Sequence, residues 1–204
     1  SVDVADPEGL FQFSMELNER CKGPKTEKYR IYGTPVNVLV HQKLCCLPSY
    51  NFQRGTFEFA EEISGERMLR THVKKVIACT NCPIACDHVN EVRDGPYKGT
   101  VASMDYESLD MLGPCCGVGD LDSITKAVEI CDTMGVDTIS AGVIIAWAME
   151  CFQKGLLTAK DNGGLNLSFG NADALVQMVE QIGKRSGLGD LLGEGTMRAS
   201  AKLG

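Results

Sequence analysis

The sequence predicts a mostly α fold, a multihelical domain. Three observations support this prediction. Apolar residues recur at helical spacing through the second half, residues that cap or end helices flank those segments, and strand and helix patterns do not alternate. At least five helices and one short strand are expected. At about 150 residues per domain, the length of 204 residues corresponds to a single helical domain, residues 1–204.

The N-terminal segment is predicted to be a helix. Asp6 can cap it, Pro7 suits the first helical position, and Gly23-Pro24 ends it. Four apolar residues are available for burial on this helix: Leu10, Phe13, Met15 and Leu17.

The stretch that follows is less regular. Turn formers dominate residues 24–56, where the Val-Asn-Val-Leu-Val sequence of residues 36–40 favours a short strand. Helical patterning returns over residues 57–77, with an interruption at Ser64-Gly65. Residues 90–104 are expected to form a loop, because Gly95-Pro96 and Gly99 favour turns.

Two helices are predicted in the middle of the second half. Asp122 can cap the first, and Gly135 ends it. Its apolar face has helical spacing: Ile124, Ala127, Val128, Cys131 and Met134. The second begins at Ser140, runs to Lys154 and is apolar nearly all round, so it is expected in the centre of the core.

The C-terminal part continues the helical pattern. After a loop over residues 158–170, Asn171 can cap a helix that stops at Gly187. Residues 190–203 are expected to form one helix or two short ones. Both ends of the sequence break into helical patterns, so the chain is expected to be one domain of a longer protein.

Composition excludes several classes of protein. The longest apolar run, Val143–Met149, is far shorter than the roughly 20 residues that span a bilayer, so no membrane span is expected. The acidic start of the chain does not match a signal peptide, and the net charge of −7 disfavours a nucleic-acid partner. Ten cysteines in a chain without an export signal indicate a reducing, cytoplasmic location.

The strongest chemical signal is a group of three cysteines, Cys79, Cys82 and Cys86. Three thiolates at this spacing can point inward from one loop and suit either Zn²⁺ or an iron–sulfur cluster. A structural zinc needs a fourth ligand, for which His88 is the nearest candidate. A four-iron cluster also needs a fourth ligand, which can lie far away in the chain. The alternative is three unrelated buried cysteines.

A second motif runs from Asp132 to Asp137 through Gly135 and Val136. The structural interpretation is a helix ending, in which Gly135 takes the left-handed conformation and Val136 makes the apolar contact. The functional interpretation is that the two carboxylates accept hydrogen bonds from a ligand rich in N–H groups.

Glu107 lies between Tyr106 and Ser108, near an expected helix start. A glutamate in this position is commonly a solvated charge favoured by the helix dipole. Enclosure would raise its pKa and make it a usable general acid or base.

Together and in this order, the three motifs resemble the central domain of tungsten-containing aldehyde ferredoxin oxidoreductases. The flanking sequences 47–52 (Leu-Pro-Ser-Tyr-Asn-Phe) and 187–195 match as well, so the resemblance covers nearly the whole chain. It implies that the chain is the middle of three domains, about a third of the enzyme and inactive alone. It also implies dependence on the missing first and last domains, which supply the fourth cluster cysteine and a second pterin motif.

The resemblance also implies roles for individual residues. Cys79, Cys82 and Cys86 would be ligands of a [4Fe–4S] cluster. Asp132, Gly135, Val136 and Asp137 would contact a bis-pterin that holds tungsten or molybdenum, with Val136 in place of the family's leucine. Glu107 would be the acidic residue beside the metal that moves protons.

The implied activity is oxidation of a small aldehyde to a carboxylic acid, with ferredoxin as electron acceptor, in an anaerobic cytoplasm. A homo-oligomer is compatible with the resemblance. Two alternatives are a related enzyme that reduces an aromatic acyl thioester or other carbonyl compound, and a non-catalytic helical zinc or iron–sulfur module.

Overall fold

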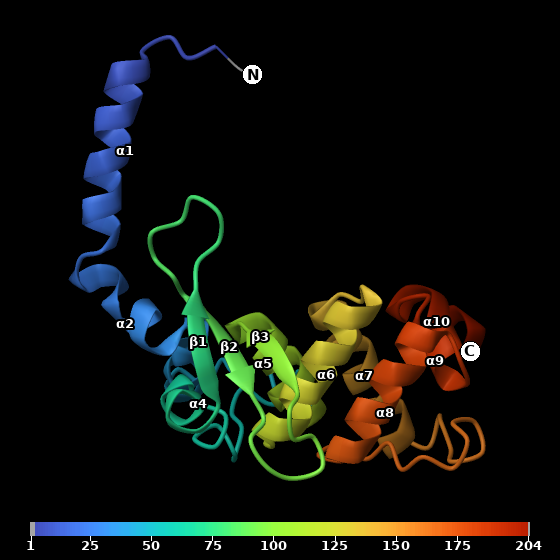
Figure 1. The fold of residues 1–204 in the computed structure, drawn as a ribbon. Helices are drawn as coiled ribbons and strands as arrows, with labels where there is room; N and C mark the ends of the chain where they lie inside the picture. The colour runs from blue at the N-terminus through green and yellow to red at the C-terminus, as the bar shows by residue number, and fades with distance from the viewer. Residues whose placement is uncertain (1–2, 204) are drawn as a thin grey trace.

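A computed structural model describes residues 3–203 and confirms the mostly α fold. Within that range ten α-helices surround or flank one three-stranded sheet (Figure 1). No helix in the described range is both long and apolar enough to cross a membrane.

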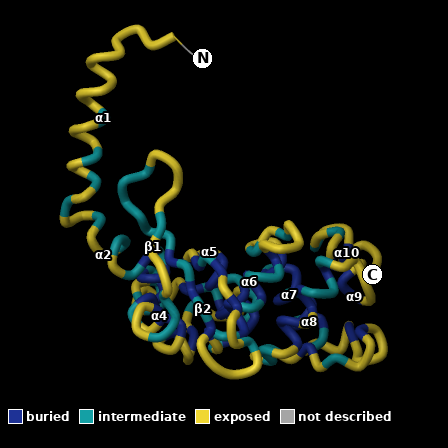
Figure 2. Tube along the Cα trace, in the orientation of Figure 1, coloured by how far each residue is buried: buried dark blue, intermediate teal, exposed yellow. Residues whose placement is uncertain are grey.

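The N-terminal helix forms where the sequence predicts it. Helix α1 spans Pro7–Cys21, and the Asp6 carboxylate accepts a hydrogen bond from the Gly9 amide at 2.9 Å. The expectation that its apolar residues are buried is wrong, because α1 projects from the body of the molecule (Figures 1 and 2). The exposed fraction of the large apolar residues of α1 runs from 43% for Leu17 to 61% for Phe11. An amphipathic pattern identifies an apolar face but does not provide a surface to cover it.

The stretch predicted to be irregular is largely helical. Helix α2 spans Pro24–Tyr32, a 3₁₀ turn (η1) spans Thr34–Val36, and α3 spans Asn37–Lys43. The strand expected over residues 36–40 is therefore wrong. The Gln42 side chain bonds both backbone groups of Phe57 and ties α3 to a distant segment, so tertiary contacts override the β preference of this valine-rich run.

The helix expected over residues 57–77 is only partly present. Helix α4 spans Gly65–Thr71, and Ser64 caps it by accepting from the Arg67 amide. Residues 73–77 instead form strand β1 (Val73–Ile77), whose three central residues are exposed. This pattern has no period-2 alternation, which is why sequence periodicity did not reveal the strand.

The sheet is antiparallel in the order β1-β2-β3. Strand β2 spans Asp87–Glu91 and β3 spans Val101–Met104, so the loop expected over residues 90–104 is confirmed only in its middle. Ile77 pairs with Asp87 and His88 pairs with Met104. The segment 78–86, which carries the three cysteines, is the loop between β1 and β2 and extends toward α1 in Figure 1.

The second half contains the main helical packing. Helix α5 spans Tyr106–Leu112 and is followed by the 3₁₀ turn η2 (Pro114–Cys116). Helix α6 spans Leu121–Met134 with Asp120, not Asp122, as its cap. Helix α7 spans Thr138–Gln153, so it begins two residues before the predicted Ser140, and Asp137 caps it.

The last helices follow the predicted order. The loop at residues 158–170 is confirmed, and Asn171 caps α8 (Ala172–Lys184), which ends before Gly187. The C-terminal part forms the two short helices α9 (Leu188–Leu192) and α10 (Thr196–Leu203).

Buried residues concentrate where α5 packs on α7 and where α6 packs on β3 and α8 (Figure 2). Helix α7 is central, as its apolar sequence predicts. Gly142 allows α7 to lie close to α5 at Met111. A Cβ at residue 142 would lie only 2.5 Å from the backbone C and O of Met111. The spacing of α5 and α7 is therefore set by backbone contact.

Candidate cofactor site

The cysteine loop uses two left-handed residues to turn sharply. Asn81 has φ 62° and Ala85 has φ 55°, and the Cys82 amide donates to the Cys79 carbonyl at 3.0 Å. Cys79 is exposed, and Cys82 and Cys86 are partly exposed. Within residues 3–203 no three His, Cys, Asp or Glu side chains are grouped closely enough to hold a metal ion alone. The thiols are therefore near the surface, free of disulfides, and the cluster remains a prediction.

Two of the three cysteines share one cavity with the acidic motifs. This polar pocket, about 340 Å³, is lined by Cys79 and Cys86 together with Asp87, Asp105 and Asp132. Four hydroxyl side chains complete most of its wall: Thr34, Ser103, Ser108 and Thr138. Cys82 instead faces a hollow against α1, beside Ser14 and Asn18.

The carboxylates of the polar pocket repel one another. Partial burial, and then the charges of Asp105 and Asp87, raise the pKa of Asp132. Burial likewise raises the pKa of the Cys86 thiol, with smaller contributions from the Cys82 and Cys79 thiolates and Asp87. A ligand that presents N–H donors or positive charge would relieve this repulsion.

Glu107 does not line this pocket, although Asp105 and Ser108 on either side of it in the sequence do. The Asp105 carboxylate accepts from the Ser108 amide at 2.7 Å, so Asp105 both starts the helix and lines the pocket. Glu107 itself is exposed in the first turn of α5, as expected for a solvated charge near a helix start. No side chain of the described residues encloses it.

The motif from Asp132 to Asp137 forms a Schellman helix ending. Gly135 has φ 69°, its amide donates to Asp132, and the Val136 amide donates to the Cys131 carbonyl at 2.9 Å. The structural interpretation of this motif is thus confirmed. Asp132 faces the polar pocket on one side of the turn, and the rest of the motif faces a second cavity.

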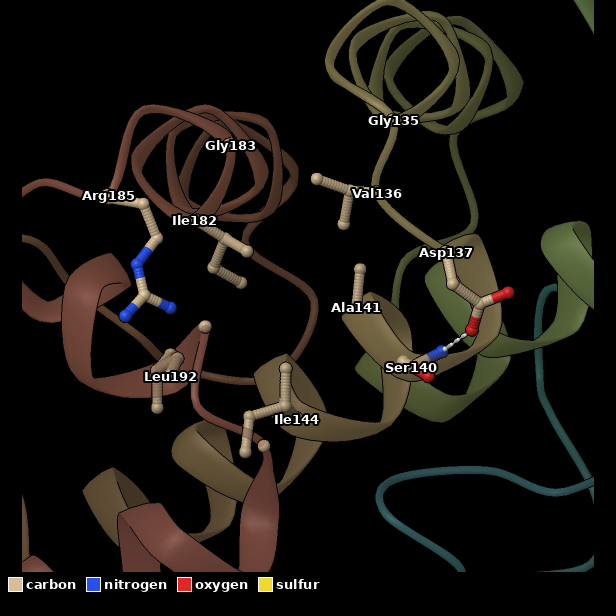
Figure 3. A pocket seen from close by; sticks show the side chains of 12 residues that line it. Gly135, Val136, Asp137, Ser140, Ala141, Ile144, Ile182, Gly183, Arg185 and Leu192 are labelled. Carbon is tan, nitrogen blue, oxygen red and sulfur yellow. Dashed lines mark hydrogen bonds between the residues drawn. The ribbon is translucent and has the colours of Figure 1, made fainter.

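This second cavity, the glycine-rich pocket, has a volume of about 350 Å³ (Figure 3). Gly135, Val136 and Asp137 form one side, and Asp137 accepts from the Ser140 amide at 2.7 Å. Gly183, Gly193 and Gly195 belong to the facing segments. The sequence 187–195 that carried part of the resemblance therefore faces the Asp132–Asp137 motif across a cavity.

His88, the nearest candidate for a fourth ligand, is completely buried on β2. Neither of its ring nitrogens has a hydrogen-bond partner at proper geometry within the described residues. Burial lowers the pKa of His88. Its ring lies over Gly33, where a Cβ would lie 2.5 Å from Nδ1.

One polar group was not identified from the sequence. Asp110 is 1% exposed and accepts a hydrogen bond from the Tyr106 hydroxyl at 2.9 Å, and its Oδ1 has no partner within residues 3–203. His41 approaches the same hydroxyl at 2.6 Å from α3. The four-residue spacing of Tyr106 and Asp110 on one helix was the available signal, but the contribution of His41 depends on tertiary packing.

Comparisons with known proteins identify one family over nearly the whole chain. The family described as aldehyde ferredoxin oxidoreductase, domains 2 and 3, matches residues 12–204. The chain is 40% identical over 207 residues to a tungsten-containing aldehyde ferredoxin oxidoreductase of Pyrococcus horikoshii and 37% identical to that of Pyrococcus abyssi. In both cases 99% of the chain and 34% of the relative are covered, so the chain spans about a third of their length.

A solved structure has a similar fold. The active-site complex BamBC of benzoyl coenzyme A reductase, bound to 1,5-dienoyl-CoA, matches with a TM-score of 0.70 at 22% identity. The match covers 96% of this chain and 30% of that chain.

Proposed function

Because the chain belongs to the aldehyde ferredoxin oxidoreductase family, we propose that it is the central part of a pterin–tungsten, or pterin–molybdenum, iron–sulfur oxidoreductase. The full-length enzyme would oxidise an aldehyde to a carboxylic acid and pass the electrons to ferredoxin. This chain would contribute three cluster cysteines, one pterin-contacting motif and an acid/base glutamate.

One observation carries the proposal. Cys79 and Cys86, Asp132, and the Asp105 that starts the helix of Glu107 all line the polar pocket, although they come from three separate segments. Residues from each of the three motifs, or directly beside it, thus line one cavity, although Cys82, Glu107 and residues 135–137 do not. A set of unrelated structural residues would not need to meet there.

The residues present fit the proposed cofactors chemically. Cys79, Cys82 and Cys86 are free thiols near the surface and would provide three cluster ligands, with the fourth from outside this chain. A pterin ring presents N–H donors, and the crowded carboxylate of Asp132 would accept them. Gly135, Val136 and Asp137 would fix the backbone next to the pterin ring, through the Schellman turn that ends α6 and the Asp137 cap that begins α7.

When bound, the pterin-held metal and the cluster would supply the oxygen-atom and one-electron chemistry. The protein's own part is to bind, orient and move protons. Glu107 would take a proton at its carboxylate and return it to water, which requires that the remaining domains enclose it. Ser108 and Thr138, whose hydroxyls hydrogen-bond, fix the helix that carries Glu107.

Aldehyde oxidation is strongly reducing, so a low-potential acceptor such as ferredoxin suits the reaction. The free cysteines and an oxygen-sensitive cluster suit an anaerobic, reducing cytoplasm. A homo-oligomer is compatible with this assignment.

The test uses the full-length protein that contains this chain, purified without oxygen. We expect tungsten or molybdenum, pterin, and iron with acid-labile sulfide in nearly equal amounts, together with aldehyde-dependent reduction of ferredoxin. Turnover of an aromatic acyl thioester without aldehyde oxidation would favour the related reductase. Zinc without iron would overturn the proposal in favour of a structural module.

A further inference from the structure

Three side chains, two from α5 and one from α3, form a continuous hydrogen-bonded row. His41 Nδ1 lies 2.6 Å from the Tyr106 hydroxyl oxygen, and that hydroxyl donates to Asp110 Oδ2 at 2.9 Å. Tyr106 and Asp110 lie one turn apart on α5, whereas His41 comes from α3. The row therefore links two elements that are far apart in the sequence.

Burial increases along this row. His41 is half-buried, Tyr106 is 8% exposed and Asp110 is 1% exposed. The His41 and Tyr106 rings meet edge to face, with centroids 4.8 Å apart. The Tyr106 amide also donates to Thr34 at 2.8 Å, and Gln42, next to His41, bonds the Phe57 backbone. The row is thus held rigidly and runs from the outside of the molecule to its interior.

The hydrogen bonds have one consistent direction. The tyrosine hydroxyl has one proton and gives it to Asp110, so the short contact with His41 requires that Nδ1–H donate to the tyrosine oxygen. Among the described residues Asp110 Oδ1 has no hydrogen-bond partner, although it is shielded from water. An unpaired buried carboxylate oxygen is costly and calls for a functional explanation.

We propose that His41, Tyr106 and Asp110 form a proton path that connects Glu107 to the surface at α3. The proposal rests on the proposed function, in which the remaining domains cover Glu107, exposed in this chain, so that its protons need a route to water. Glu107 lies three residues before Asp110, and residues at this spacing are neighbours on a helix surface. Oδ1 of Asp110 has no hydrogen-bond partner among the described residues, so it is the free acceptor in this row.

The transfer balances without any redox partner. Oxidation of an aldehyde with water releases two protons and two electrons, and the path carries a proton outward. Asp110 receives a proton on Oδ1, and rotation of its carboxyl group presents that proton to Tyr106. Before the next step, His41 exchanges its ring proton through solvent from Nδ1 to Nε2, and the Tyr106 hydroxyl rotates to donate to the bare Nδ1. The O–H bond of Asp110 then breaks as one forms at the Tyr106 oxygen, while the original Tyr106 proton moves to His41 Nδ1 and makes the ring an imidazolium. His41 releases a proton from Nε2 to solvent, which leaves the hydrogen-bond directions of the structure.

The surroundings of Asp110 suit this role. Burial raises its pKa to about 7, the hydrogen bond from Tyr106 opposes that shift, and the charge of Glu107 adds to it. The other titratable groups facing this row are Cys46, which follows α3, and Cys115 in η2, whose pKa burial raises to about 12. A carboxyl group with a pKa near 7 can both accept and release protons at neutral pH.

The test uses the full-length protein with Tyr106→Phe and His41→Ala, and with Tyr50→Phe as the matched control. Tyr50 also donates its hydroxyl to a carboxylate, Glu58, but lies outside this row. We expect Tyr106→Phe to lower kcat about tenfold with KM for the aldehyde unchanged, a loss within the span of a positioned proton-transfer group. We expect His41→Ala to show a similar loss that added imidazole partly restores, and Tyr50→Phe to keep the wild-type kcat.

An infrared pH titration gives a readout independent of turnover. We expect the band of a protonated, buried carboxyl group in the wild type, absent in Asp110→Asn and shifted in frequency in Tyr106→Phe. A wild-type protein with no such band on the acid side of neutral pH would overturn the path. Equal kcat in wild type, Tyr106→Phe and His41→Ala would also overturn it. A loaded protein that oxidises no aldehyde but shows this titration would contradict the proposed function instead.

Discussion

The Ser108 Oγ lies 2.8 Å from Thr138 Oγ1, so the helix that carries Glu107 is hydrogen-bonded to the first residue of α7. Thr138 directly follows Asp137, the last residue of the motif assigned to the pterin. This contact fixes the acid/base candidate relative to the cofactor motif, and both hydroxyls lie in the wall of the polar pocket.

Replacing Glu107 by Gln should remove proton transfer without changing the fold. In the full-length enzyme we expect turnover to fall by at least about tenfold, the lower end of the usual contribution of a positioned acid or base. Metal, pterin and iron contents should stay at wild-type levels. Glu27→Gln, in the first turn of α2, is the matched control. Wild-type turnover in Glu107→Gln would refute its role.

Replacing Cys82 by Ser should abolish cluster assembly, because serine lacks the thiolate that a cluster iron requires. The measurement is iron and acid-labile sulfide per chain in the full-length protein, purified without oxygen. Cys21→Ser is the control, since Cys21 lies at the end of α1, outside the cysteine loop. An unchanged iron content in Cys82→Ser would show that the three cysteines do not hold a cluster.

Replacing Asp110 by Asn should change how stability depends on pH. The pKa of Asp110 is about 7 in the folded chain against 3.8 in the reference state, so between those values the folded state binds more protons than the unfolded state. Its contribution to stability is therefore present at low pH and is lost as pH rises toward 7. The amide side chain of the Asp110→Asn variant cannot titrate. The free energy of unfolding of the variant, relative to that of the wild type, should therefore rise by up to roughly 4 kcal/mol between acid and alkaline pH.

Urea unfolding of the wild type and Asp110→Asn at a series of pH values measures this difference. Asp94→Asn is the control, because the Asp94 side chain is 94% exposed. A difference between Asp110→Asn and wild type that is constant with pH would show that Asp110 titrates normally.

Replacing Gly142 by Ala should destabilise the chain despite the better helix propensity of alanine. The new Cβ would lie 2.5 Å from the backbone of Met111, which cannot move aside as a side chain can. We expect a loss of about 1–3 kcal/mol from overpacking, larger than the gain of about 1 kcal/mol in helix propensity. Gly183→Ala is the comparison, since its Cβ would meet the flexible Met134 side chain. A lower melting temperature for Gly183→Ala than for Gly142→Ala would contradict this explanation.

The sequence was most informative where local chemistry decides the structure, although the cap of α6 is Asp120 and not the predicted Asp122. Asp6 and Asn171 cap helices as predicted, and Gly135 ends one with the expected turn, whereas Ser64, expected to interrupt a helix, caps α4. The sequence did not reveal α3, because the pairing of Gln42 with Phe57 is a long-range contact. It also missed the sheet, whose first strand is mostly exposed and has no alternating pattern.

The candidate site shows the same division. The three motifs could be found from spacing and resemblance, but that Cys79 and Cys86 share a pocket with Asp132 depends on the fold. His88 contacts Gly33, and His41 reaches Tyr106 and Asp110, only because the tertiary structure brings distant elements together.

The contact of Gly142 with Met111 has a consequence for how enzymes of this type can be re-engineered. With backbone against backbone, α5 and α7 cannot be drawn closer, and any larger residue at position 142 forces them apart. The room available to a substrate or cofactor near Thr138 must then be altered by exchanging the side chains that line it. A library that varies Ser103 and Val128 while keeping Gly142, Thr34 and Ser108 would change this wall and retain the contacts that hold α5.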